Sequence, residues 1–175
     1  MSGKKLFAID FGASGGKCFA GIFEGKSFSM REVHRFALEG TSLFIPEKNG
    51  KVTERSHWDD ILLFRNIELG LQAYRREISD KLDSIGIDTW GADGQFINEN
   101  GEMLSKIYCY RDHRLDNMIE VVKRRIAAKR MYEITGIHFQ PFNISNQLHW
   151  FVKNRRDLMK SARVFLPVPS VFNYY

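Results

Sequence analysis

The chain of 175 residues has 43% hydrophobic and 27% charged side chains and a formal net charge of +5. This composition is typical of a globular protein with one sizeable core, and it excludes an intrinsically disordered chain. No apolar run approaches the roughly 20 residues that a membrane span needs, and the run after the N-terminal lysines is too short for a signal peptide. We therefore expect a cytoplasmic protein with no membrane partner.

The cysteines, the histidines and the basic residues give no sign of a metal site or a nucleic-acid site. Cys18 and Cys109 lie far apart and outside any CxxC spacing, so two reduced thiols are expected. The histidines have no metal-ligand spacing. A basic helical face is expected in one segment, but no nucleic-acid-binding motif accompanies it, so no nucleic-acid partner is expected. The residues of this face are Lys123, Arg124, Arg125, Lys129 and Arg130.

The first elements predicted are strands. Apolar runs cover residues 5–10, 17–23 and 27–36, and Gly25 with Lys26 forms a turn between the last two. Two tight connections in succession favour an antiparallel meander over a βαβ unit. Residues 41–53 read as a loop, with a short strand after Asn49-Gly50.

A long helix and a strand follow. Ser56 is expected to cap a helix that begins near Trp58, with Asp59 and Asp60 in its first turn. Apolar residues at spacings of three and four predict one buried stripe on this helix: Phe64, Ile67, Leu71, Tyr74 and Ile78. Residues 84–89 predict a strand.

The remaining chain is predicted to be mainly helical. Helices are expected over 115–132, closed by Gly136, and over 142–154, with a short strand at 163–166. Ser170 is expected to cap a helix that has only begun at Tyr175. From this abrupt stop we expect residues 1–175 to be an incomplete N-terminal domain of a longer protein.

The strongest chemical signal is the turn between the first two strands, where Asp10 is followed by Phe-Gly-Ala-Ser-Gly-Gly-Lys. Three glycines permit a tight turn whose backbone N–H groups can hold phosphate oxygens. Ser14 adds a hydroxyl, Lys17 a cation, and Asp10 a ligand for a metal ion beside the phosphates. The order matches neither a Walker A loop nor a Rossmann fingerprint. The alternative is a plain glycine-rich hairpin with a solvated Asp10.

A second signal follows the strand at 84–89. Gly91 permits close approach to the backbone, Asp93 can accept hydrogen bonds from hydroxyls, and Trp90 offers a flat wall to a sugar face. The alternative is that Trp90 belongs to the core and the acids serve turns. A third cluster, Tyr-Arg-Asp-His-Arg at 110–114, binds a ligand or forms surface ion pairs.

Taken together and in this order, these motifs resemble those of the FGGY carbohydrate kinases. Within the family the resemblance is to kinases of L-rhamnulose. It runs from about Leu6 to the last residue, and four further segments carry it: 31–36, 83–91, 136–143 and 166–170. The glycine motif is shared with the wider actin, Hsp70 and hexokinase superfamily, whereas the others are more specific.

The resemblance implies an α/β fold: a ribonuclease H-like, actin-like ATPase domain with a mixed sheet, an N-terminal antiparallel meander and flanking helices. It implies ATP and Mg²⁺ as cofactors and a ketose as the substrate. Asp10 would lie near the metal, and Gly91, Asp93, Trp90 and Arg111 near the sugar. The implied nucleotide-binding residues are Ala13, Ser14, Gly15, Gly16 and Lys17.

The chain departs from the family pattern at two positions. Family members often carry Arg at the position of Lys17, and an aromatic residue where this chain has Gly94. The family's catalytic base is an aspartate expected beyond Tyr175, so no catalytic residue is assigned within this chain. We expect the isolated chain to have little kinase activity and to self-associate through the apolar residues of its C-terminal edge.

Two other interpretations remain open at this point. The chain is either a kinase fragment, a non-catalytic half-domain that binds a sugar or a partner, or a general actin-like nucleotide-binding module. The segment from Trp90 to Asp93 argues against the last, because such modules need no sugar shelf there.

Overall fold

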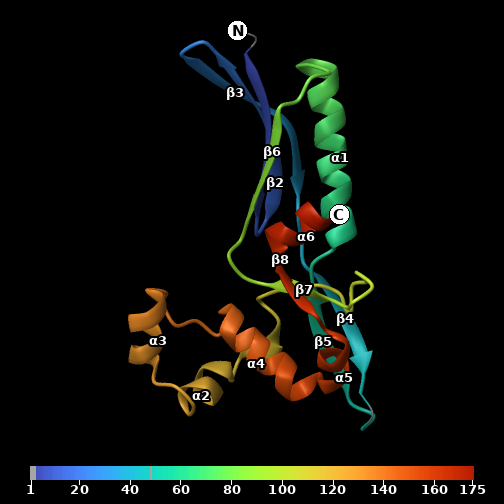
Figure 1. Cartoon of the computed structure of the whole chain (residues 1–175). Coiled ribbons are helices and arrows are strands. Elements are labelled where there is room, and N and C mark those ends of the chain that lie inside the picture. Colours follow the sequence, from blue (N-terminus) through green and yellow to red (C-terminus); the bar gives the residue numbers. More distant parts are fainter. Residues whose placement is uncertain (1–2, 48) are drawn as a thin grey trace. The chain divides into compact units, whose positions relative to one another are not determined.

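The computed structural model describes residues 3–47 and 49–175, which divide into two compact units. Unit 1 consists of residues 3–39, 59–91 and 168–175, and unit 2 of Gly40–Trp58 and Ala92–Pro167. Figure 1 labels most of their elements. In the part of the chain that is described, no helix has the length and apolar character needed to cross a membrane.

Unit 1 is built on a four-stranded mixed sheet in the order β3-β2-β1-β6. β1 to β3 form the predicted antiparallel meander, and β6 joins β1 in parallel. The expected mixed sheet is therefore confirmed. Its strands are β1 (Lys4–Gly12), β2 (Gly15–Glu24), β3 (Ser27–Ala37) and β6 (Ser84–Thr89).

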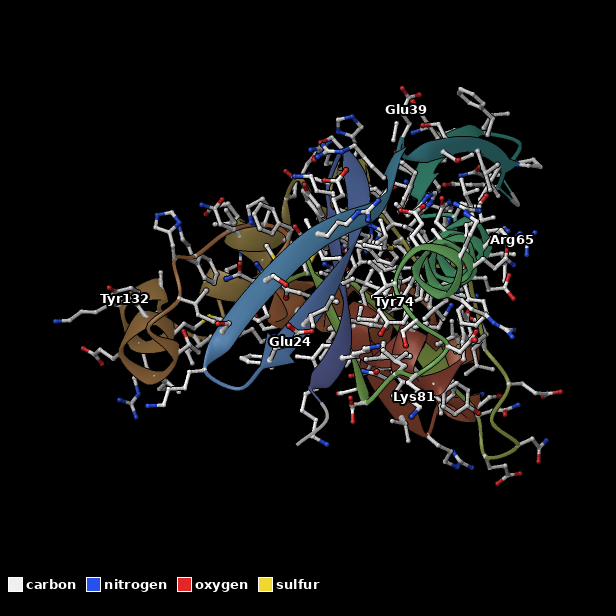
Figure 2. The ribbon with its side chains drawn as sticks, turned by 90° about the horizontal axis from the view of Figure 1, so that it is seen from above. Glu24, Glu39, Arg65, Tyr74, Lys81 and Tyr132 are labelled. Carbon is white, nitrogen blue, oxygen red and sulfur yellow. The ribbon has the colours of Figure 1, made fainter. Side chains whose placement is uncertain are left out.

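Helix α1 (Asp60–Glu77) covers one face of this sheet. The ring of Phe7 in β1 meets that of Tyr74 edge to face at 5.8 Å. Figure 2 shows Tyr74 on the side of α1 that faces the strands and Arg65 on the opposite side. A Cβ atom at Gly70 would lie 2.6 Å from the Cys18 sulfur, so glycine is what allows this close approach.

The predicted start and stripe of α1 need correction. Asp59, not Ser56, caps the helix, because its carboxylate accepts a hydrogen bond of 2.9 Å from the Leu62 amide. Ser56 belongs to strand β5 (Val52–His57). The buried stripe is rotated slightly from the predicted one and consists of Leu63, Asn66, Ile67, Gly70, Ala73 and Tyr74.

Helix α6 (Val168–Tyr174) packs on the same face of the sheet as α1. It begins two residues before Ser170, so Ser170 lies inside the helix and is not its cap. Phe172 is 4% exposed, and its ring meets that of Phe11 at 5.2 Å. The expectation that this aromatic end of the chain is uncovered is therefore wrong for Phe172.

Unit 2 contains two antiparallel pairs of strands. The segment predicted as a loop forms a hairpin in which Thr41 pairs with His57 and Ile45 with Thr53. The short strand predicted after Asn49-Gly50 is confirmed (Val52–His57), whereas the loop prediction failed for the strand before it, because that exposed strand carries few alternating apolar residues. The strands are β4 (Thr41–Pro46), β5 (Val52–His57), β7 (Gly94–Ile97) and β8 (Val164–Pro167).

The helix predicted over 115–132 is in fact two separate short helices, preceded by a 3-10 turn that ends at Leu115. Ala127 has the extended backbone φ −61°, ψ 138°, which ends the helical run and starts the next. Gly136 closes that next helix with φ 66°, as predicted. The helical elements of unit 2 are η1 (His113–Leu115), α2 (Met118–Lys123), α3 (Ala128–Thr135), α4 (Ile144–Asn154) and α5 (Arg156–Ser161).

Two aromatic-rich clusters form the core of unit 2. One gathers around Phe96, Tyr108, Phe151 and Leu158, and the other around Leu115, Met118 and Val122. Trp150 packs against both. Helix α4, which carries Trp150 and Phe151, is thus the central helix of this unit.

Candidate functional site

The glycine-rich segment forms the turn between β1 and β2 in unit 1. Gly12 pairs directly with Gly15, so Ala13 and Ser14 are the two turn residues. None of the glycines in this turn has a positive φ. The expectation that they serve the turn through their conformational freedom is therefore not met.

Close packing explains the glycine at position 16. A Cβ atom at Gly16 would overlap the rings of Phe36 and Phe11. At Gly15 it would lie 2.5 Å from the carbonyl oxygen of Phe36. The turn is therefore pressed against β3, and this fixes the backbone of the segment that was predicted to hold phosphates.

The sheet brings four charged residues into one row across its strands. Asp10 of β1 lies opposite Lys17 of β2 and opposite Asp88 of β6. Lys17 in turn lies opposite Arg35 of β3. Directly opposed residues project from the same face of a sheet, so two cations and two carboxylates share one face.

A cavity of about 600 Å³ opens at the turn end of this row. It lies wholly within unit 1. The residues around it include most of the predicted phosphate-binding set together with three that the sequence did not single out, Arg35, Phe36 and Ala37. Its lining is Asp10, Gly12, Ser14, Gly15, Gly16, Lys17, Arg35, Phe36 and Ala37.

One cation of this phosphate pocket, as we call it, is held in place by an acid. Arg35 donates two hydrogen bonds to the Glu32 carboxylate, at 2.8 and 2.6 Å. This hydrogen bonding, with the charges of Arg35 and Lys17, lowers the pKa of Glu32 below its usual value. A fixed guanidinium and a second cation beside a serine hydroxyl suit the oxygens of a phosphate chain.

The donor set also fits a magnesium ion that arrives with phosphates. Mg²⁺ usually takes one or two protein carboxylates and completes its coordination with phosphates and water. Asp10 lines the pocket, and Asp88 lies next to it in the row. Among the described residues no group of three or more His, Cys, Asp and Glu side chains gathers to hold a metal without such a ligand.

The residues predicted to bind the sugar are divided between the units. Trp90 and Gly91 follow β6 in unit 1, where Trp90 is half-buried and Gly91 exposed. A Cβ atom at Gly91 would have no described atom within 4 Å. Asp93 and Arg111 belong to unit 2.

Asp93 is a buried residue, with 1% of its surface exposed and a left-handed φ of 68°. Its Oδ2 atom accepts hydrogen bonds from the Trp58 indole at 2.8 Å and the Tyr110 amide at 3.0 Å. Its Oδ1 atom accepts one of 2.9 Å from the Gln147 side chain. Burial and these donors indicate that Asp93 positions its neighbours, and they do not support the direct contact with a sugar hydroxyl that its spacing suggests.

The network continues from Gln147 to a buried ion pair. Arg114 donates to the Gln147 side chain at 2.8 Å, and its Nη1 atom lies 3.4 Å from Asp112. Its guanidinium carbon lies 4.3 Å from the centre of the Tyr108 ring. Burial lowers the pKa of Arg114, while Asp112 acts in the opposite direction.

The Tyr-Arg-Asp-His-Arg cluster therefore has two parts. Asp112 and Arg114 are buried in unit 2, so they form a buried ion pair and not one of the surface ion pairs that were predicted as an alternative for this segment. Arg111 is exposed, and its guanidinium carbon lies 5.3 Å from the centre of the Tyr110 ring. The Tyr110 ring also meets that of Phe142 at 5.4 Å.

Comparisons with known proteins bear on this arrangement. Residues 40–175 match the model of the N-terminal domain of the FGGY family of carbohydrate kinases. The rhamnulokinase of Halalkalibacterium halodurans is 36% identical over 167 residues, which cover 95% of this chain and 33% of that protein. The rhamnulokinase of Mannheimia succiniciproducens is 34% identical over 176 residues, covering 97% and 33%. This chain thus spans about one third of the length of these relatives.

Solved structures show the same fold at low sequence identity. The match to gluconate kinase from Lactobacillus acidophilus covers 95% of this chain and 32% of the gluconate kinase chain, with a TM-score of 0.72 and 17% identity. The match to Plasmodium falciparum glycerol kinase with ADP covers 95% of this chain and 33% of the glycerol kinase chain, with a TM-score of 0.67 and 15% identity. The actin-like α/β fold that the sequence motifs imply is confirmed by these structures.

Proposed function

Because the chain belongs to the FGGY family of carbohydrate kinases, we propose that the whole protein transfers a phosphoryl group from ATP to a ketose, with L-rhamnulose as the substrate. The rhamnulokinase names of the similar proteins support this choice of sugar. L-fuculose, L-ribulose and D-xylulose are the rival substrates. Residues 1–175 would be an incomplete N-terminal domain of this cytoplasmic enzyme.

The observation that carries the proposal is the phosphate pocket. Lys17 and Arg35 line it from neighbouring strands, and Ser14 and Asp10 belong to the same lining. Phosphoryl transfer depends mainly on positioning and on neutralising charge, and these groups suit both tasks. The structure of glycerol kinase with ADP supports a nucleotide as the ligand of this fold.

Each residue of the pocket has a distinct part in the proposed reaction. Lys17 acts as a point charge on phosphate oxygens, whereas the planar guanidinium of Arg35 can donate two parallel hydrogen bonds. Gly15 and Gly16 contribute backbone, and Ser14 a hydroxyl donor. Ala13, which lies in the turn but outside the pocket lining, would contribute its backbone N–H group. Asp10 would hold Mg²⁺, which when bound neutralises charge on the transferred phosphate.

Trp90 and Gly91 of unit 1 and, separately, Arg111 of unit 2 are the residues proposed to contact the sugar, and Asp93 would position the neighbour of Arg111. Trp90 offers a flat apolar wall, Gly91 leaves room above the backbone, and Arg111 offers a cation. Asp93 fixes the Tyr110 backbone, to which Arg111 is attached. No catalytic base is assigned within residues 1–175, and we place it in the remainder of the whole protein.

A substrate panel on the full-length protein tests the proposal. With Mg-ATP we expect turnover of L-rhamnulose, at a kcat/KM higher than for the rival ketoses. Turnover of a rival alone would keep the kinase assignment and change the sugar. The absence of turnover with any ketose or polyol would reject the kinase assignment and favour a non-catalytic binding domain.

A further inference from the structure

A second cavity, of about 370 Å³, lies entirely within unit 2. One wall is the β4–β5 hairpin, and the other is the last turn of α4 with the residue that follows it. Its size falls in the range of small-molecule sites, which is roughly 300 to 1,000 Å³. We call it the hairpin pocket, and it is lined by Ile45, Glu47, Thr53, Arg55, Tyr108, Trp150, Asn154 and Arg155.

The hairpin pocket has a fixed aromatic wall. Trp150 is half-buried, and its ring meets those of Tyr108 at 5.7 Å and Phe151 at 5.4 Å, both edge to face. The guanidinium carbon of Arg114 lies 5.4 Å from the centre of the Trp150 ring. The core therefore sets the orientation of Trp150, and a rigid aromatic surface suits the apolar face of a sugar ring.

Two guanidinium groups give the pocket its positive charge. Arg155 is oriented by the Asp157 carboxylate, with hydrogen bonds of 3.3 and 3.2 Å. Arg55 donates to the Glu54 carbonyl at 3.2 Å, and it forms no ion pair within 4.0 Å among the residues that the structure describes. Arginine side chains in such a setting recognise phosphate oxygens, often with two parallel hydrogen bonds.

Acceptors for hydroxyl groups lie in the same pocket. Glu47 accepts a hydrogen bond from the Thr53 hydroxyl, and this bond lowers the pKa of Glu47. It therefore remains a carboxylate at neutral pH. Asn154 adds an amide from the end of α4. A carboxylate and an amide beside an aromatic wall are the groups that hold sugar hydroxyls.

From this combination we propose that the hairpin pocket binds a phosphorylated monosaccharide, with the sugar against Trp150 and the phosphate on Arg55 and Arg155. A neutral sugar leaves Arg55 without an anionic partner, and inorganic phosphate leaves the aromatic wall empty. The site is separate from the phosphate pocket, which belongs to unit 1. The proposal does not depend on the kinase assignment.

Calorimetric titration of the 175-residue chain tests this site with three probes: fructose 1-phosphate, fructose and inorganic phosphate. We expect fructose 1-phosphate to bind about tenfold or more tightly than either other probe, because only it uses both walls. Quenching of tryptophan fluorescence should accompany binding and disappear in Trp150→Leu. Equal affinity for phosphate and fructose 1-phosphate would overturn the proposal.

Single substitutions locate the binding. Arg55→Gln should weaken fructose 1-phosphate about tenfold or more, since it removes a charge-assisted hydrogen bond. Lys153→Gln, on the exposed side of α4 and outside the pocket lining, is the matched control and should bind as the wild type does. Binding that is lost in Lys17→Gln and retained in Arg55→Gln would assign the ligand to the phosphate pocket and overturn the proposal.

Discussion

The phosphate pocket of unit 1 and the Asp93 network of unit 2 use the same types of side chain in opposite ways. In the pocket, Asp10 and Arg35 are exposed on one face of a sheet. In the network, Asp93 and Arg114 are buried, at 1% and 8% exposure, and donate to or accept from groups of the same unit. Exposed charges remain available to a ligand, whereas buried ones must be satisfied internally.

The difference shows that an acidic residue in a glycine-rich segment carries no fixed role. Asp10 and Asp93 were both predicted to contact a ligand, but Asp10 lines a cavity with its predicted partners, whereas Asp93 is buried and bonded to groups of its own unit. Breaking a buried network costs folding free energy, while removing an exposed charge costs binding or rate. Substitutions in the Asp93 network should therefore change the free energy of unfolding, and substitutions in the phosphate pocket should change binding or rate.

The largest expected effect is on folding, through Asp93. Asp93→Ala removes the carboxylate that accepts hydrogen bonds from the Trp58 indole, the Tyr110 amide and the Gln147 side chain. We expect a loss of about 3–5 kcal/mol in the free energy of unfolding, measured by urea denaturation. Asp93→Asn should lose less, because Asn tolerates the left-handed backbone and keeps one acceptor. Asp10→Asn is the control and should change stability by no more than about 0.5 kcal/mol.

The next effect is on rate, through Asp10. In the full-length protein, Asp10→Asn should slow kcat about a hundredfold, or about 3 kcal/mol of transition-state stabilisation, because the proposed magnesium ligand is lost. Asp88→Asn is the matched control, since Asp88 lies in the same row but outside the pocket lining. Steady-state kinetics should show a smaller decrease in kcat for Asp88→Asn than for Asp10→Asn. An unchanged kcat in a folded Asp10→Asn protein would remove Asp10 from the reaction.

A third effect concerns self-association, which we now expect through the sheet of unit 1. Phe28 and Met30 are 54% and 62% exposed on the face opposite α1. Burying apolar surface is worth about 25 cal/mol per Å², so these side chains favour association. The double substitution Phe28→Ser, Met30→Ser should reduce the molar mass of the 175-residue chain that light scattering measures in solution. Ile134→Ser, which removes an equally exposed side chain from α3, should not.

The smallest effect expected is on the pH dependence of stability, through His57. Burial lowers the pKa of His57 from its ordinary 6.5, and its ring packs on Tyr108 at 4.6 Å. The unfolded chain therefore binds a proton that the folded chain resists. Neutral His57 contributes fully to the free energy of unfolding above about pH 6.5, and this contribution is lost as the pH falls through the lowered pKa of His57 in the folded chain. Between pH 7.5 and pH 5.5, the midpoint temperature of thermal unfolding should fall more for the wild type than for His57→Gln.

The sequence determined the local elements whose signals lie close together along the chain. The meander, the strand at 84–89 and the left-handed cap at Gly136 were all predicted from turn residues and apolar patterns. Prediction was weaker where a segment has no such pattern, as in the β4–β5 hairpin. It also failed for the run 115–132, where Ala127 interrupts what reads as one helix.

Only the tertiary structure decided which residues meet at each site. The turn at Gly25 pairs Glu24 with Ser27, and counting back from it places His34 opposite Lys17. A β-bulge between Cys18 and Phe19 shifts the register, so that Arg35 stands there instead. One inserted residue in a strand changes every later pairing, and no local pattern announces it. Likewise, the burial of Asp93 depends on Gln147, which lies 54 positions away in the chain.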